Sequence, residues 1–152
     1  GLLDTLDGAL ARELNQAKRQ GAFLDSVLDR YCEYFILVGI WAYFLRKGSA
    51  TPLITLTVFL VFFGSFMVSY IRARAEGLQV SCLAGLFQRA ERTIAIGAAA
   101  MVNSLVNFTA RANETALFGQ DAVLIVALIL LAVGTNLTAL WRLFDVLNKL
   151  RP

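Results

Sequence analysis

Four apolar segments of the chain constrain its fold more than any other feature. They cover residues 21–45, 52–71, 93–108 and 122–140, and the first begins as a helix near Gly21. The fourth is long enough to cross a hydrocarbon core, which takes about 20 helical residues. Pro52 stands where a helix would begin, and Trp141 stands where an interfacial aromatic residue is expected. The segments predict an all-α fold, a polytopic transmembrane helical bundle with about four spans.

The composition agrees with a membrane protein and excludes several kinds of catalysis. Of the 152 residues, 58% are hydrophobic and 16% are charged, whereas a soluble domain has about 45–50% apolar and about 25% charged residues. The chain contains no histidine, which excludes the Ser-His-Asp triad, imidazole–zinc sites and histidine acid–base catalysis. Cys32 and Cys82 have no metal-ligand spacing and are read as small buried or interfacial side chains. Carboxylates must therefore carry any proton transfer.

Four aspartates lie before or at the start of the first apolar segment: Asp4, Asp7, Asp25 and Asp29. Helical spacings of three and four residues place each consecutive pair on one helix face. Carboxylates at a membrane edge are tolerated when they bind a cation, and an all-oxygen ligand set favours Mg²⁺ or Mn²⁺. Two such ions would suit phosphoryl chemistry. Gly8 and Ala11 continue the first face almost without side chains, which leaves room for a nucleotide.

The spacing Asp4-x2-Asp7-Gly8-x2-Ala11-Arg12-x8-Gly21-x3-Asp25-x3-Asp29 resembles the signature of the CDP-alcohol phosphotransferases. Eight positions match in residue type and spacing, whereas a solvated helix face would explain the charges but not the small residues. The resemblance implies two metal ions, the first bound by Asp4, Asp7 and Asp25 and the second by Asp7, Asp25 and Asp29. It implies a CDP-binding surface at Asp4, Gly8, Ala11, Arg12 and Gly21.

The resemblance also implies a reaction in which an acceptor hydroxyl attacks the phosphorus that bears the lipid, with CMP as leaving group. Asp29 is the candidate base for that hydroxyl, and a role as metal ligand alone is the alternative. The lipid donor would be CDP-diacylglycerol or CDP-archaeol, and no nucleic-acid partner is expected.

Four arginines flank the connection between the second and third segments: Arg72, Arg74, Arg89 and Arg92. Arginine makes bidentate contacts with phosphate, so these residues form a candidate site for an acceptor phosphate. Glu76 and Glu91 lie close enough in sequence to take part of this charge in local ion pairs. The segments around the arginines resemble the family branch that uses inositol phosphate, that is, phosphatidylinositol-phosphate synthases and their archaeal ether-lipid counterparts. Glycerol 3-phosphate is the alternative acceptor.

The distribution of basic residues predicts the orientation. If the segments alternate, 11 of the 14 basic residues share one side, and only Arg46, Lys47 and Arg111 lie on the other. The positive-inside rule then places the aspartates at the cytoplasmic face of the cell membrane. Anionic lipid headgroups are the expected neighbours of the basic residues near the carboxyl end, Arg142, Lys149 and Arg151.

Residues 1–152 are expected to form a single membrane domain that lacks one to two amino-terminal helices of the family, which commonly forms homodimers. Two non-enzymatic alternatives are a divalent-cation transporter and a structural membrane subunit with an acidic binding face. A transporter predicts carboxylates deep in several spans, and the last three segments have none there. A structural subunit leaves the spacing of Gly8, Ala11 and Gly21 unexplained.

Overall fold

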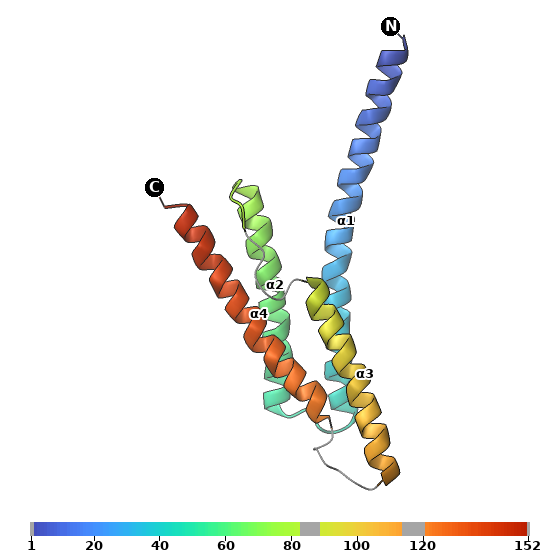
Figure 1. The fold of residues 1–152 in the computed structure, drawn as a ribbon, viewed down its shortest axis with the longest axis vertical. Helices are drawn as coiled ribbons and strands as arrows, with labels where there is room; N and C mark the ends of the chain where they lie inside the picture. The colour runs from blue at the N-terminus through green and yellow to red at the C-terminus, as the bar shows by residue number, and fades with distance from the viewer. Residues whose placement is uncertain (1, 83–88, 114–120, 152) are drawn as a thin grey trace. The chain divides into compact units, whose positions relative to one another are not determined.

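In the residues that the structure describes, the chain forms four helices (Figure 1). The computed structural model describes the backbone of residues 2–82, 89–113 and 121–151, and the side chains of residues 18, 20–82, 91–109 and 121–151. The helices are α1 (Leu2–Arg46), α2 (Pro52–Gly77), α3 (Arg89–Asn113) and α4 (Ala122–Lys149). No strand occurs in the described residues, which confirms the all-α prediction. The chain forms two units, residues 1–36 and 37–152, and α1 contributes to both.

Helix α1 runs without interruption for 45 residues. The expectation that a helix begins near Gly21 is therefore wrong, since the helix begins at Leu2 and continues through that glycine. The physical reason is the composition of residues 9–20, in which Ala, Leu, Arg, Glu, Gln and Lys predominate and proline is absent. These residues have high helix propensity, and nothing in the segment ends the helix.

The other three helices contain the predicted segments and extend beyond them. Thr51 caps α2 by accepting a hydrogen bond from the backbone N–H of Ile54 at 3.3 Å, and Pro52 follows at the first helical position. Helix α4 continues for two turns past the predicted end at Leu140, so Trp141 lies inside the helix and not after it. Helices α2 and α4 are each long and apolar enough to span a membrane by length and composition.

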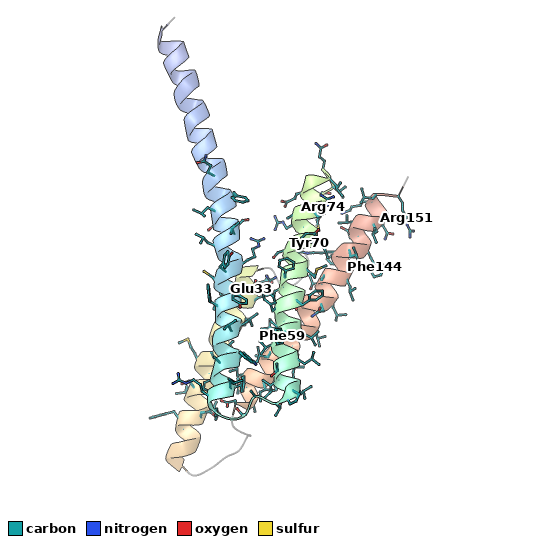
Figure 2. The ribbon with its side chains drawn as sticks, turned by 180° about the vertical axis from the view of Figure 1, so that it is seen from behind. Glu33, Phe59, Tyr70, Arg74, Phe144 and Arg151 are labelled. Carbon is teal, nitrogen blue, oxygen red and sulfur yellow. The ribbon has the colours of Figure 1, made fainter. Side chains whose placement is uncertain are left out.

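The second unit is built around the contact between α2 and α4, which run side by side in the same direction, while α3 packs against α4 in the opposite direction (Figure 1). One apolar cluster joins the carboxyl-terminal part of α1 to the other helices, through Leu37, Phe44, Val61, Ile96 and Leu128. A second cluster joins α2 and α4 nearer their carboxyl ends. Large apolar side chains such as Phe59 and Phe144 remain exposed on the outside (Figure 2), as a lipid-facing surface requires.

Helices α2 and α4 approach closely at Gly64. A Cβ atom built on Gly64 would lie 2.3 Å from Oγ1 of Thr135 and 2.7 Å from Nδ2 of Asn136. The Asn136 amide donates hydrogen bonds to the carbonyl oxygens of Leu60 at 3.0 Å and Ala132 at 2.7 Å, and so connects the two helices. Small and polar residues at such a contact are typical of membrane helices.

Candidate active site

All eight signature positions lie on α1. Asp25 and Asp29 are one helical turn apart, and the Asp25 side chain is exposed whereas the Asp29 side chain is half-buried. Arg30, the next residue, donates a hydrogen bond to the backbone carbonyl of Ser26. The side chains of Asp4, Asp7 and Arg12 lie outside the described part of the structure. Each aspartate pair therefore has the helical spacing that was predicted for it.

The structure does not bring the two aspartate pairs together. Asp7 and Asp25 are 18 residues apart on an uninterrupted helix, and a rise of 1.5 Å per residue separates them by about 27 Å along its axis. Among the side chains that are described, no group of three or more Asp, Glu, Cys or His residues could hold a metal ion. The four-aspartate metal site accordingly remains a prediction, and it requires the chain to turn back between Arg12 and Gly21.

The arginines of the second unit come from three helices. Arg92 on α3 is 1% exposed and Arg142 on α4 is 4% exposed, and the charges of Arg72 and Arg92 both act on Arg142. Nη1 of Arg142 donates a hydrogen bond to the carbonyl oxygen of Val68 at 2.9 Å. Its Nε atom is buried and has no hydrogen-bond partner among the residues that the structure describes. This N–H group is thus a donor for which the described residues supply no acceptor.

The remaining predicted phosphate ligands differ in their surroundings. Arg72 is exposed and pairs with Glu76, with 2.9 Å between Nε and Oε1, as the sequence spacing predicted. Arg74 is exposed at the end of α2, the same end of the second unit at which Arg151 closes the described chain after α4 (Figure 2). The side chain of Arg89 lies outside the described residues.

Arg142 is the residue that the sequence analysis misassigned. It was expected to meet lipid headgroups, but it is buried and bonded to the backbone of α2. The signal was present in the helical spacing, because Ala139, Arg142 and Val146 share one face of α4 and all three are buried. Lys149 likewise bonds within the protein, to Asp145 at 2.8 Å and to the carbonyl oxygen of Ser81 at 2.8 Å.

The sequence model of the CDP-alcohol phosphatidyltransferase family matches residues 1–144. The chain belongs to this family, whose members are generally dependent on divalent metal ions. Its helical fold and two apolar helices fit an integral membrane protein of this class.

Among the similar proteins are archaetidylinositol phosphate synthases and phosphatidylinositol phosphate synthases. The archaetidylinositol phosphate synthase of Methanothermobacter thermautotrophicus is 43% identical over 107 residues, which cover 70% of this chain and 51% of that protein. The phosphatidylinositol phosphate synthase of Streptomyces avermitilis is 35% identical over 145 residues, which cover 94% of this chain and 56% of that protein. The chain thus spans about half the length of the curated relatives that it matches.

Proposed function

We propose that the full-length protein acts in phospholipid biosynthesis. It transfers a phosphatidyl or archaetidyl group from CDP-diacylglycerol or CDP-archaeol to a hydroxyl of inositol phosphate and releases CMP. Family membership supports the CDP-lipid donor, and the names of the relatives support the inositol phosphate acceptor. Glycerol 3-phosphate is the second candidate acceptor, because the same cationic side chains would bind its phosphate.

The observation that carries the choice of a phosphorylated acceptor is the convergence of arginines from α2, α3 and α4. Arg142 is buried, and a buried cation is costly unless a counter-charge or hydrogen bonds compensate for lost hydration. A phosphate group offers several acceptor oxygens and a double negative charge, which match a guanidinium group that has an unpaired Nε–H. We assign the acceptor phosphate to Arg92 and Arg142, and we propose Arg72, Arg74 and Arg89 as further ligands. A neutral acceptor such as free inositol has no need of this charge.

The aspartates would supply the metal-binding and proton-accepting groups. Asp4, Asp7, Asp25 and Asp29 offer only hard oxygen ligands, which fit Mg²⁺ or Mn²⁺. Two such ions, when bound, would neutralise the diphosphate of the CDP-lipid and stabilise the departing CMP. Asp29 accepts the proton from the acceptor hydroxyl as its oxygen forms a bond to the lipid-bearing phosphorus and the bond from that phosphorus to CMP breaks. Asp4, Gly8, Ala11, Arg12 and Gly21 hold the CDP group.

This assignment requires a different path for the chain around residues 13–20. The first pair of aspartates reaches the second pair only if α1 opens there and its amino-terminal part turns back. Gly21 directly follows this stretch, and glycine lowers the cost of ending a helix. We therefore infer that the helix is interrupted before Gly21 in the active enzyme. We also propose that the enzyme is a homodimer and that its active site lies at the cytoplasmic face of the membrane.

The test is a transfer assay with the full-length protein in mixed micelles. Radiolabelled CDP-diacylglycerol is supplied with Mg²⁺ and, separately, with inositol 1-phosphate, glycerol 3-phosphate, serine or free inositol. The proposal predicts CMP release and a labelled lipid product with inositol 1-phosphate, and loss of both when EDTA removes the metal. A product with glycerol 3-phosphate alone would favour the second acceptor. If none of the four acceptors gave CMP release, the proposed transfer would be refuted.

A further inference from the structure

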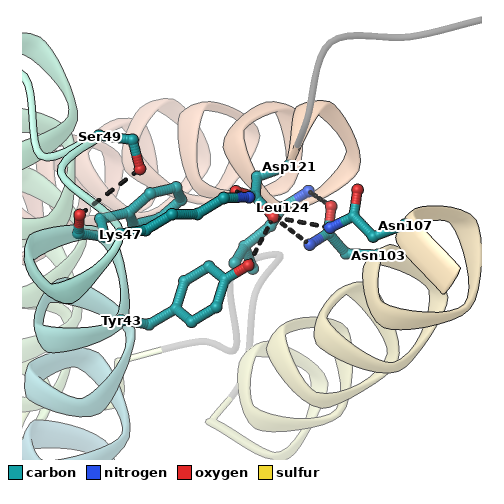
Figure 3. A network of polar contacts seen from close by, with 8 residues as sticks. Tyr43, Lys47, Ser49, Asn103, Asn107, Asp121 and Leu124 are labelled. Carbon is teal, nitrogen blue, oxygen red and sulfur yellow. Dashed lines mark hydrogen bonds and ion pairs between the residues drawn. The ribbon is translucent and has the colours of Figure 1, made fainter. Parts of the chain in front are cut away.

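A buried carboxylate lies at the end of the second unit opposite to the arginines. Asp121 is 2% exposed and directly precedes α4. Its Oδ1 atom accepts hydrogen bonds from the Tyr43 hydroxyl at 2.8 Å and from the amides of Asn103 at 2.9 Å and Asn107 at 2.8 Å. Its Oδ2 atom pairs with Nζ of Lys47 at 2.6 Å (Figure 3). Four donors therefore converge on one side chain.

Two donors lie on or directly after α1 and two lie on α3, whereas the carboxylate directly precedes α4. Tyr43 lies in the last turn of α1 and Lys47 directly follows that helix, whereas Asn103 and Asn107 are one turn apart on α3. Asn103 also accepts a hydrogen bond from the backbone N–H of Leu124 at 3.4 Å and so caps the first turn of α4. The Asp121 side chain is not used as a helix cap, and its φ of 66° turns the chain into α4.

The charges of this network are mutually stabilised. Burial acts to raise the pKa of Asp121, but the hydrogen bonds from Lys47, Asn103, Tyr43 and Asn107 outweigh it and lower the pKa from 3.8 to about 2. The hydrogen bond to Asp121 in turn raises the pKa of Lys47. The pair is consequently ionised throughout the neutral range, and its geometry is held by charge-assisted hydrogen bonds.

This network fixes the rotation and depth of the end of α1, which apolar packing alone leaves adjustable. Leu37 and Phe44 attach α1 to the core through non-directional contacts, which tolerate small rotations and displacements of the helix. Hydrogen bonds from Tyr43 and Lys47 have narrow ranges of distance and angle, so they define one rotation and one depth. A polar contact of α1 with α2, from Trp41 Nε1 to Thr55 Oγ1, is longer, at 3.4 Å.

We propose that Asp121 is a positioning residue that fixes the rotation and depth of the end of α1 against α3 and α4. Helix α1 also carries Asp29, so loss of this positioning is expected to lower turnover as well. This second consequence rests on the proposed function, whereas the first does not.

The experiment measures both consequences in the full-length protein. Nitroxide labels are placed on exposed positions by Leu45→Cys on α1 and Leu105→Cys on α3, with the native cysteines, Cys32 and Cys82 included, replaced by serine. Pulsed electron–electron double resonance then gives the distribution of distances between the labels. In parallel, kcat and KM are measured for CMP release by the same unlabelled variants.

Asp121→Asn removes the charge and is expected to broaden or shift the distance distribution and to lower kcat by roughly 10- to 100-fold, with a smaller change in the KM for the acceptor. Tyr43→Phe removes one of the four donors and should give a smaller change of the same kind, which keeps the test valid if Asp121→Asn folds poorly. The reversed pair Lys47→Asp with Asp121→Lys should restore part of both properties. Asp145→Asn breaks an ion pair on α4 near its other end and should change neither.

The outcomes separate the two ideas. An unchanged distance distribution in folded Asp121→Asn overturns the positioning role of Asp121. A changed distribution with unchanged kcat overturns its effect on turnover. Absence of transfer by the unmodified protein would instead be a failure of the proposed function, and the distance measurement would still test the positioning role of Asp121.

Discussion

Replacing Gly64 with alanine should weaken the contact between α2 and α4. The added Cβ would lie 2.3 Å from Thr135 Oγ1, 2.7 Å from Asn136 Nδ2 and 2.9 Å from Thr135 Cβ. Atoms do not approach this closely, and Thr135 is itself buried and bonded to the carbonyl oxygen of Leu131. The helices must therefore separate, and the hydrogen bond from Asn136 to Leu60 lengthens or breaks.

The magnitude follows from three contributions. Overpacking a tight contact costs about 1–3 kcal/mol, and an interhelical hydrogen bond in a membrane protein contributes about 0.6 kcal/mol. Replacing glycine by alanine inside a helix recovers up to about 1 kcal/mol. The free energy of unfolding should accordingly fall by about 1–3 kcal/mol, which corresponds to roughly 5- to 150-fold in the unfolding equilibrium constant.

The assay is equilibrium unfolding of the full-length protein by SDS in mixed micelles, followed by tryptophan fluorescence. Gly97→Ala on α3 is the matched control, because a Cβ there meets nothing within 4 Å. The control should be neutral or slightly more stable than the unmodified protein. Equal stability of Gly64→Ala and Gly97→Ala would refute the close packing of α2 on α4.

Three further predictions concern the charged groups. Arg142→Gln should raise the KM for inositol phosphate by roughly 10- to 100-fold with little effect on the KM for the CDP-lipid, whereas Arg151→Gln should change neither KM. Steady-state kinetics with each substrate varied in turn measures both values, and an equal rise of the two KM values in Arg142→Gln would contradict a phosphate pocket. Asp29→Asn should leave CDP-lipid binding intact and lower turnover by about 10²- to 10⁴-fold, and single-turnover kinetics at an unchanged rate would exclude Asp29 as the base. Folding lowers the pKa of Asp121 from 3.8 to about 2 and raises the pKa of Lys47 above 10.5. Their contribution to stability should therefore be fully present between about pH 4 and pH 10 and should decline as the pH falls toward 2 or rises above 10.5. The free energies of unfolding of the unmodified protein and of Asp121→Asn should differ least in strong acid, and a constant difference down to pH 2 would contradict this linkage.

The fold was largely predictable because backbone in a bilayer must satisfy its own hydrogen bonds. Apolar length and the signals at Thr51 and Pro52 located α2, and the apolar run after residue 121 located the start of α4. The carboxyl end of α4 was not predictable from apolarity, because its last two turns are polar on one face and still pack against α2. The continuity of α1 was missed because a glycine was given more weight than the strong helix formers before it.

The candidate site was predictable in its residues but not in its arrangement. Signature spacing identified the aspartates, yet spacing along a sequence gives no distance between the two pairs when the chain between them can be helix or turn. Arg142 was misassigned because a basic residue near the end of an apolar segment usually faces headgroups. Asp121 gave no local signal at all, since its four partners lie between 14 and 78 residues away in sequence.

The central claim is that both aspartate pairs bind the same metal ions, and Mn²⁺ binding by the full-length protein tests it most directly. Free Mn²⁺ is titrated by electron paramagnetic resonance in the unmodified protein, in Asp7→Asn, in Asp25→Asn and in the control Asp145→Asn. The account predicts that substitution in either pair lowers the affinity by at least about tenfold, while the control binds as the unmodified protein does. Undiminished Mn²⁺ binding by Asp7→Asn or by Asp25→Asn would contradict it.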